Sequence, residues 1–311
     1  MRRWTAVAAA SAVLVTGAGA GGASASLVAG GDGRDPLMLG WTSVLPPAVG
    51  TYDPGSEDAC RSGRPQCLER TLRWMRADLD RLAAACHHSS VFALSYLRTT
   101  EEYGRAVATP GFFEDPRFLN HYDAVFAEFY VRAREDWDAG RRGDVPPAWR
   151  VAFEAAEQRR VPAAADLLLG INAHVNRDLP FVLAGIGLRA PDGTSRKRDH
   201  DAVNVFLNRV TEDLIDEAAR RFDPSIDDAE LPLGLTWTTL MQLLLTWRET
   251  AWRNAERLVA APDEAARARV AAQVEATAEA YARSVVLLTS YLPPLTSPAA
   301  RERHCAVHGR G

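Results

Sequence analysis

Apolar side chains recur every three or four residues between positions 66 and 291, and no segment there alternates polar and apolar residues with a period of two. The first spacing is that of helices with one buried face, whereas the second would indicate strands. The pattern predicts eight helices, at residues 66–86, 89–108, 115–138, 147–160, 163–187, 200–221, 235–260 and 263–291. Short breaks rich in proline and glycine separate them, so neighbouring helices can pack antiparallel. We therefore expect an all-α protein, a single irregular helical bundle with an extended N-terminal segment.

The start of the chain differs from the rest. Arg2 and Arg3 precede an uncharged stretch of mostly alanine and valine, which leads to Ala23-Ser24-Ala25. This is the composition of a secretory signal peptide, and the apolar stretch is too short to span a bilayer. The alternative is a disordered Ala/Gly-rich tail on a cytosolic protein. We expect a secreted protein without a membrane span in the mature chain. Its predicted divisions are a signal peptide at 1–25, an extended lead segment at 26–65, a helical domain at 66–292 and a C-terminal tail at 293–311.

Secretion changes the interpretation of the four cysteines, because an oxidising compartment favours disulfides. Cys60 and Cys67 enclose a short, flexible loop that could close locally. That pairing would leave Cys86 to bond Cys305 and to join the end of the chain to an early helix. A zinc site formed by Cys305 and the two histidines near it is the alternative.

Charge and motifs exclude several classes of protein. The chain has 36 Lys and Arg against 40 Asp and Glu, a net charge of −4, so it offers no basic surface for phosphates and we predict no nucleic-acid partner. The motifs of zinc proteases, di-iron bundles, serine hydrolases and nucleotide-binding loops are all absent.

Polar residues lie within the apolar stripe of the helix expected at 163–187. His174 and Asp178 are one turn apart and point the same way as the leucines, with Asn172 and Asn176 at the adjoining edge. Burying such groups costs free energy unless they are paired. They therefore indicate either a hydrogen-bonded structural core or a metal or acid–base site, since histidine and carboxylate at this spacing can share one cation or one proton.

A second polar pair begins the next helix. His200 and Asn204 are one turn apart beside an apolar stripe, while Asp199 and Asp201 fit a helix start. A solvated turn histidine is the alternative for His200.

Arg248 lies in the middle of the apolar stripe of the helix at 235–260, flanked by Trp247 and Trp252. A buried guanidinium needs an anion or an aromatic face. Either an anionic ligand or one of three carboxylates could supply the anion: Asp178, Glu102 or Asp123.

The segment 168–180, LLGINAHVNRDLP, resembles the N-A-H-x-N-x-D-L hallmark of a largely actinobacterial family of unknown function. Supporting segments are 93–100, 112–116, 123–127, 147–149, 199–204 and 247–252. The resemblance covers residues 66–260 and implies an all-helical domain. It brings no established activity, cofactor or ligand.

Two functions follow as hypotheses. As an enzyme, the protein would be a metal-dependent hydrolase, in which His174, Asp178 and His200 bind a divalent metal and Arg248 holds an anionic substrate. The amides of Asn172, Asn176 and Asn204 would then contact the ligand. Alternatively, the protein binds a small anionic molecule or a lipid without catalysis, in a pocket lined by Tyr96, Trp247 and Trp252. A purely structural polar network is the third interpretation.

Overall fold

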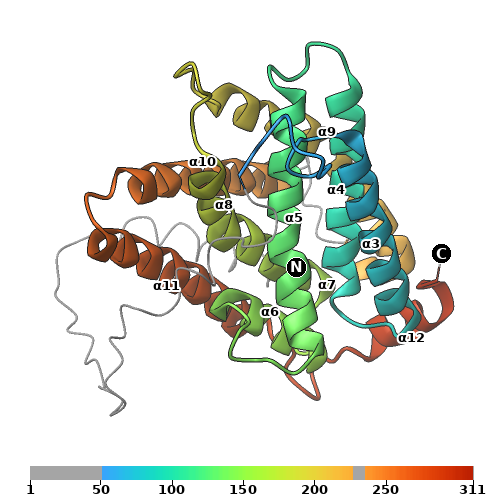
Figure 1. The fold of residues 1–311 in the computed structure, drawn as a ribbon. Helices are drawn as coiled ribbons and strands as arrows, with labels where there is room; N and C mark the ends of the chain where they lie inside the picture. The colour runs from blue at the N-terminus through green and yellow to red at the C-terminus, as the bar shows by residue number, and fades with distance from the viewer. Residues whose placement is uncertain (1–50, 227–234, 311) are drawn as a thin grey trace.

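The computed structural model describes residues 51–226 and 235–310, and this part of the chain is helical (Figure 1). The predicted signal peptide and residues 26–50 of the expected lead segment lie outside the described residues. The helical elements, in chain order, are α3 (Pro65–Ala84), α4 (Ser90–Ala108), α5 (Pro116–Asp138), α6 (Pro147–Glu157), α7 (Ala163–Ile171), η2 (Asn172–Asp178), α8 (Leu179–Ile186), α9 (Lys197–Arg221), η3 (Pro224–Ile226), α10 (Leu235–Ala260), α11 (Glu264–Thr289) and α12 (Ala299–His308).

The all-α fold class is confirmed, and each predicted helix is present. Within the described ranges no strand forms, and β pairing is limited to one isolated bridge between Arg189 and Ser195. Local chemistry explains several helix starts. Proline occupies the first turn of α3, α5 and α6, where its missing N–H costs no hydrogen bond. The carboxylate of Asp115 accepts a hydrogen bond from the N–H of Phe118 at 3.0 Å and caps α5.

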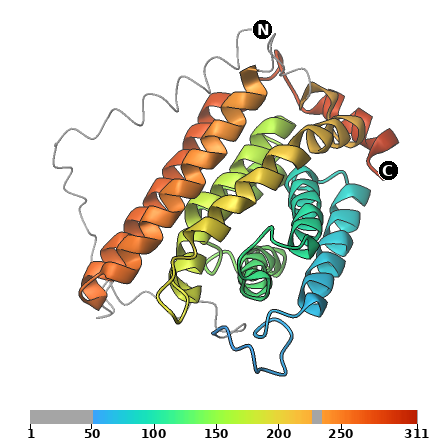
Figure 2. The same ribbon diagram turned by 90° about the horizontal axis from the view of Figure 1, so that it is seen from above.

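The helices pack around two adjoining apolar clusters. Figure 1 shows α5 between α8 and α3, and Figure 2 shows α10 and α11 side by side at one side of the bundle with α3 at the other. One cluster centres on Phe92, Tyr130 and Trp149, and the other on Phe118 and Phe181. Side chains from both clusters line the cavity described below, so the cavity lies where the two clusters meet.

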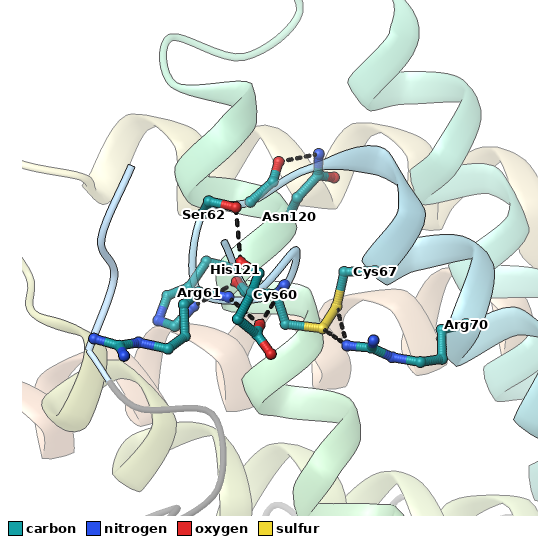
Figure 3. The surroundings of a disulfide bond; sticks show 9 residues. Cys60, Arg61, Ser62, Cys67, Arg70, Asn120 and His121 are labelled. Atoms are coloured by element: carbon teal, nitrogen blue, oxygen red, sulfur yellow. Dashed lines mark hydrogen bonds between the residues drawn. A yellow bond between two sulfur atoms is a disulfide. The ribbon is translucent and has the colours of Figure 1, made fainter. Parts of the chain in front are cut away.

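The Cys60–Cys67 disulfide fastens the lead segment to α3, and hydrogen bonds fasten it to α5 (Figure 3). His121 Nδ1 lies 2.9 Å from the carbonyl oxygen of Cys60, and the amide of Asn120 donates to the carbonyl of Gly63 at 3.0 Å. Gly63 has a φ of +64°, and a Cβ there would lie 1.7 Å from the carbonyl oxygen of Arg117. Only glycine fits this contact between the lead segment and α5.

The end of the chain is a helix rather than the expected tail. The second disulfide, Cys86–Cys305, joins the end of α3 to α12, so the predicted cysteine pairing is confirmed. Its formation rules out the zinc alternative, because Cys305 has no free thiolate to offer. The buried guanidinium of Arg301 binds the Asp166 carboxylate and donates to the His88 carbonyl at 3.1 Å, which anchors α12 further. Among the described residues no helix is long and apolar enough to cross a bilayer.

The two disulfides should contribute unequally to stability. Cys86–Cys305 joins residues 219 positions apart and Cys60–Cys67 residues 7 apart. The chain-entropy model gives about 5 and about 2 kcal/mol for loops of these lengths. We expect the Cys86→Ala/Cys305→Ala double variant to lose more free energy of unfolding than Cys60→Ala/Cys67→Ala, measured by urea denaturation. Equal losses would show that the long loop is already constrained in the unfolded chain.

Candidate functional site

A π-helical segment, η2, interrupts the helix between α7 and α8. It comprises residues 172–178, and all seven side chains are buried. π-Helical turns are rare and occur often at functional sites. Pro180 follows directly and has no N–H to donate, so the regular hydrogen-bond ladder cannot continue through this point. The segment N-A-H-V-N-R-D is therefore also the irregular part of the helix.

Asp178 is the centre of a hydrogen-bond network at η2. Its side chain is fully buried, and its Oδ2 accepts hydrogen bonds from Trp149 Nε1 at 2.9 Å and from His174 Nδ1 at 3.0 Å. Its Oδ1 accepts from Arg177 at 3.0 Å, and Arg177 also binds Glu275. Trp149 and Arg177 can only donate to this carboxylate, and Nδ1 of His174 is assigned as its third donor, so Nδ1 carries the ring proton. Burial lowers the pKa of His174, and this effect outweighs that of Asp178, which raises it. The imidazole is therefore neutral, and its Nε2 has a free lone pair.

The side-chain amides of Asn172 and Asn176, which were expected to contact a ligand, instead stabilise the packing of η2. Asn172 donates to the carbonyl of Ala278 on α11 at 2.8 Å, and Asn176 donates to the side-chain oxygen of Asn172 at 3.0 Å. Neither residue is part of the cavity lining.

A cavity of about 130 Å³ lies against η2, and its other lining residues come from α4, α5, α7, α9 and α10. Most of its wall is apolar, with leucine, isoleucine, valine, phenylalanine and methionine side chains. Its size is close to that of a cavity of roughly 150 Å³ that accommodates benzene in another protein. The cavity can therefore hold a molecule of about that size, or a short chain.

Four buried polar atoms of the cavity lining have no hydrogen-bond partner in the part of the chain that the structure describes. They are Tyr96 Oη, Thr100 Oγ1, Asp123 Oδ2 and His174 Nε2. A buried polar atom without a partner costs about 1–3 kcal/mol. Other unpartnered buried atoms lie elsewhere in the described residues, but these four share one cavity, so a single molecule bound there would give all of them partners.

Asp123, on α5, is the least expected of these residues. Burial raises the pKa of its carboxyl to about 7. No Lys, Arg or His within the described ranges forms an ion pair with it. Asp123 is half-buried and lines the cavity. The sequence suggests Asp123 only as a partner for Arg248, because its position at the edge of an aromatic helix face does not reveal a cavity.

Arg248 reaches the cavity wall from α10 and is buried. Its Nε donates to Asn204 Oδ1 and its Nη2 to the carbonyl oxygen of His200, each at 2.6 Å, and it also interacts with the Tyr122 hydroxyl. No carboxylate of the described residues lies within 4.0 Å of it, so none of the three carboxylate partners considered from the sequence pairs with it. Burial lowers its pKa, but a guanidinium stays protonated in proteins.

The predicted metal site of His174, Asp178 and His200 does not form. Both ring nitrogens of His200 face protein atoms at 3.4 Å, the hydroxyl of Tyr122 and the carbonyl of Arg248. Both oxygens of Asp178 are occupied by donors, as described above. Across residues 51–226 and 235–310, no group of three or more His, Cys, Asp or Glu side chains could hold a metal ion.

The predicted pocket residues divide into two groups. Tyr96 lines the cavity, whereas Trp247 and Trp252 lie outside the lining. The Trp252 ring packs against His200 with centroids 5.2 Å apart, and its Nε1 donates to Glu256 at 2.9 Å. Both tryptophans belong to the apolar core near α10.

Comparison with known protein families matches residues 68–288 to a family described as a family of unknown function (DUF5995). The chain belongs to this family. The match includes η2 and all the helices around the cavity, so the expected membership of a family of unknown function is confirmed. No curated protein and no solved structure matches the chain.

The absence of a hydrogen-bond partner for the Tyr96 hydroxyl can be tested by comparison with a tyrosine whose hydroxyl is hydrogen-bonded. Tyr103 also lines the cavity, and its hydroxyl donates to Asn120 at 2.8 Å. Tyr103→Phe should cost about 1 kcal/mol in the free energy of unfolding, because it removes a buried hydrogen bond. Tyr96→Phe should leave stability unchanged or raise it, measured by urea denaturation without ligand. A comparable loss in both variants would contradict an unpartnered Tyr96 hydroxyl.

Asp123 should make stability depend on pH. Its folded pKa of about 7 exceeds the ordinary 3.8, so the folded state binds this proton more tightly than the unfolded state. The resulting stabilisation is complete below about pH 4 and is lost as pH rises to 7. Asp123→Asn should therefore gain stability relative to the wild type between pH 5 and pH 8, measured by urea denaturation at both values. A difference that does not change with pH would contradict the raised pKa.

Proposed function

We propose that this protein binds a small amphiphilic anion in the cavity, with the apolar body of the ligand against the hydrophobic wall and its carboxylate on Arg248. The observation that carries this proposal is the buried guanidinium of Arg248, which has only neutral partners among the described residues. Removing a cation from water is costly unless an anion compensates it.

The neutral partners of Arg248 orient the guanidinium without neutralising it. Asn204 and the carbonyl of His200 use Nε and Nη2, and Tyr122 is the third neighbour. An arginine has five N–H donors, so donors remain for a ligand. A carboxylate can accept two parallel hydrogen bonds from a guanidinium, a geometry that adds both strength and specificity.

The size and lining of the cavity limit the ligand. A volume of about 130 Å³ suits a molecule with a six-membered ring or a short alkyl chain rather than a long lipid chain. Ligand sites of this kind are typically apolar with a few polar groups that fix orientation. The four unpartnered polar atoms described above supply those groups.

We also propose that the protein is exported. Two disulfides support this, because structural disulfides are rare in reducing compartments. The signal peptide expected from the sequence agrees with export.

The ligand proposal is tested by calorimetric titration with benzoate and hexanoate, and with benzyl alcohol as a neutral counterpart. The wild type should bind the acids. Arg248→Met should weaken this binding by at least tenfold and affect benzyl alcohol little, while Arg248→Lys should give an intermediate loss because it keeps the charge without the paired geometry.

Arg253→Met is the matched control on the same helix. Its guanidinium is mostly exposed and pairs with Glu249 and Glu256. This variant should bind like the wild type. Wild-type protein that binds neither acid, or Arg248→Met that binds them unchanged, would refute the proposal and favour a structural role for the network.

A further inference from the structure

Asp123 is a second buried ionisable group in the same cavity wall as Arg248, and it has the opposite charge when ionised. The two do not form an ion pair with each other, since their charged atoms are more than 4.0 Å apart. The cavity therefore contains one basic and one acidic group, neither of which forms an ion pair within the described residues, although the charge of Asp201 acts on Arg248 from farther away. A ligand with one charge of each sign would satisfy both.

The unpartnered atoms around Asp123 identify the kind of group that fits there. His174 Nε2 is an acceptor, because Nδ1 carries the proton that binds Asp178. Asp123 Oδ2 is an acceptor when ionised, and the hydroxyls of Tyr96 and Thr100 can also accept. A primary ammonium offers three N–H donors to such a set, whereas a hydroxyl offers one.

Aromatic rings form much of the wall near these acceptors. Tyr96, Tyr122 and Phe126 line the cavity, and the Phe126 ring stacks on His174 with centroids 3.6 Å apart. The Asp123 charge also acts on Tyr96, Tyr103 and Tyr122, which places these rings close to its carboxylate. Aromatic faces attract cations, and they do so more strongly away from water.

We propose that Asp123 binds a primary ammonium group of the ligand, assisted by His174, Tyr96 and Thr100, so that the ligand is a small apolar amino acid. This inference rests on the proposed function, in which Arg248 holds the carboxylate. The apolar wall between the two groups holds the hydrocarbon part. The cavity volume of about 130 Å³ limits that part to a few carbon atoms.

The proposal has a consequence for pH. The pKa of Asp123 in the ligand-free protein is about 7 because of burial, so binding of an ammonium group near neutral pH requires loss of this proton. Affinity for the amino acid should therefore rise as pH increases from 6 to 8.

The other titratable groups of the lining should not change charge over this range. Burial raises the pKa values of Tyr96, Tyr103 and Tyr122 and lowers that of His174. Arg248 stays protonated, and α9 contributes only apolar residues and Thr211 to the cavity.

The test is calorimetric titration of the full chain at pH 6 and pH 8 with four six-carbon acids: hexanoate, 2-aminohexanoate, 6-aminohexanoate and 6-hydroxyhexanoate. At pH 8, one of the two amino acids should bind the wild type at least tenfold more tightly than hexanoate. The isomer preferred reports the spacing between Asp123 and Arg248. Its affinity should fall severalfold at pH 6, while that of hexanoate should not fall.

Asp123→Asn should abolish the advantage of the amino acid and keep hexanoate binding. Asp136→Asn is the control, because Asp136 lies on the same helix as Asp123, pairs with Arg141 and lies outside the lining. Hexanoate binding without any gain from an amino group overturns this inference alone, as does tightest binding of 6-hydroxyhexanoate. Failure of all four acids to bind overturns the proposed function itself.

Discussion

The arrangement of the site depends on the hydrogen bonds that the buried Asp178 carboxylate accepts. It accepts hydrogen bonds from Trp149 on α6 and from His174 and Arg177 on η2. An isolated buried carboxylate would be very costly, but donors on both oxygens compensate its charge. The same bonds hold η2 against α6 and fix the proton of His174 on Nδ1. The cavity acceptor at Nε2 is a direct consequence.

Polar groups inside the bundle therefore divide into two kinds. Those around Asp178 and Arg301 form ion pairs that stabilise the packing of η2 and α12, although one oxygen each of Asp166 and Glu275 has no partner among the described residues. Those of the cavity lining lack suitable partners: Asp123 has a carboxylate oxygen without a hydrogen bond, and Arg248 has hydrogen bonds only to neutral groups among the described residues. Evolution of a stable core alone favours the first kind, because unpaired groups lower stability. The second kind is typical of a site whose partners arrive with a ligand.

The sequence predicts the fold well because helix periodicity and helix ends are local properties. The predicted break after residue 108 and the start near 163 match α4 and α7 within a residue. Contact between His174 and Asp178 also follows from their spacing of one turn. The burial of Arg248 follows from its place in an apolar stripe, but its partners do not, because they lie on α5 and α9. The neighbours of His200 likewise cannot be predicted from the local sequence pattern. The sequence pattern also does not predict the π-helical geometry of η2, because helices with i→i+4 and i→i+5 hydrogen bonds give similar apolar stripes.

The central claim is that the cavity holds a ligand whose anionic group lies on Arg248. A crystal structure of the protein grown with hexanoate tests this most directly. The account predicts electron density for the acid inside the cavity, with its carboxylate within hydrogen-bond distance of the Arg248 guanidinium. Ordered waters in its place, bridging Arg248, Asp123 and His174 with no acid bound, would contradict the account and identify the network as structural.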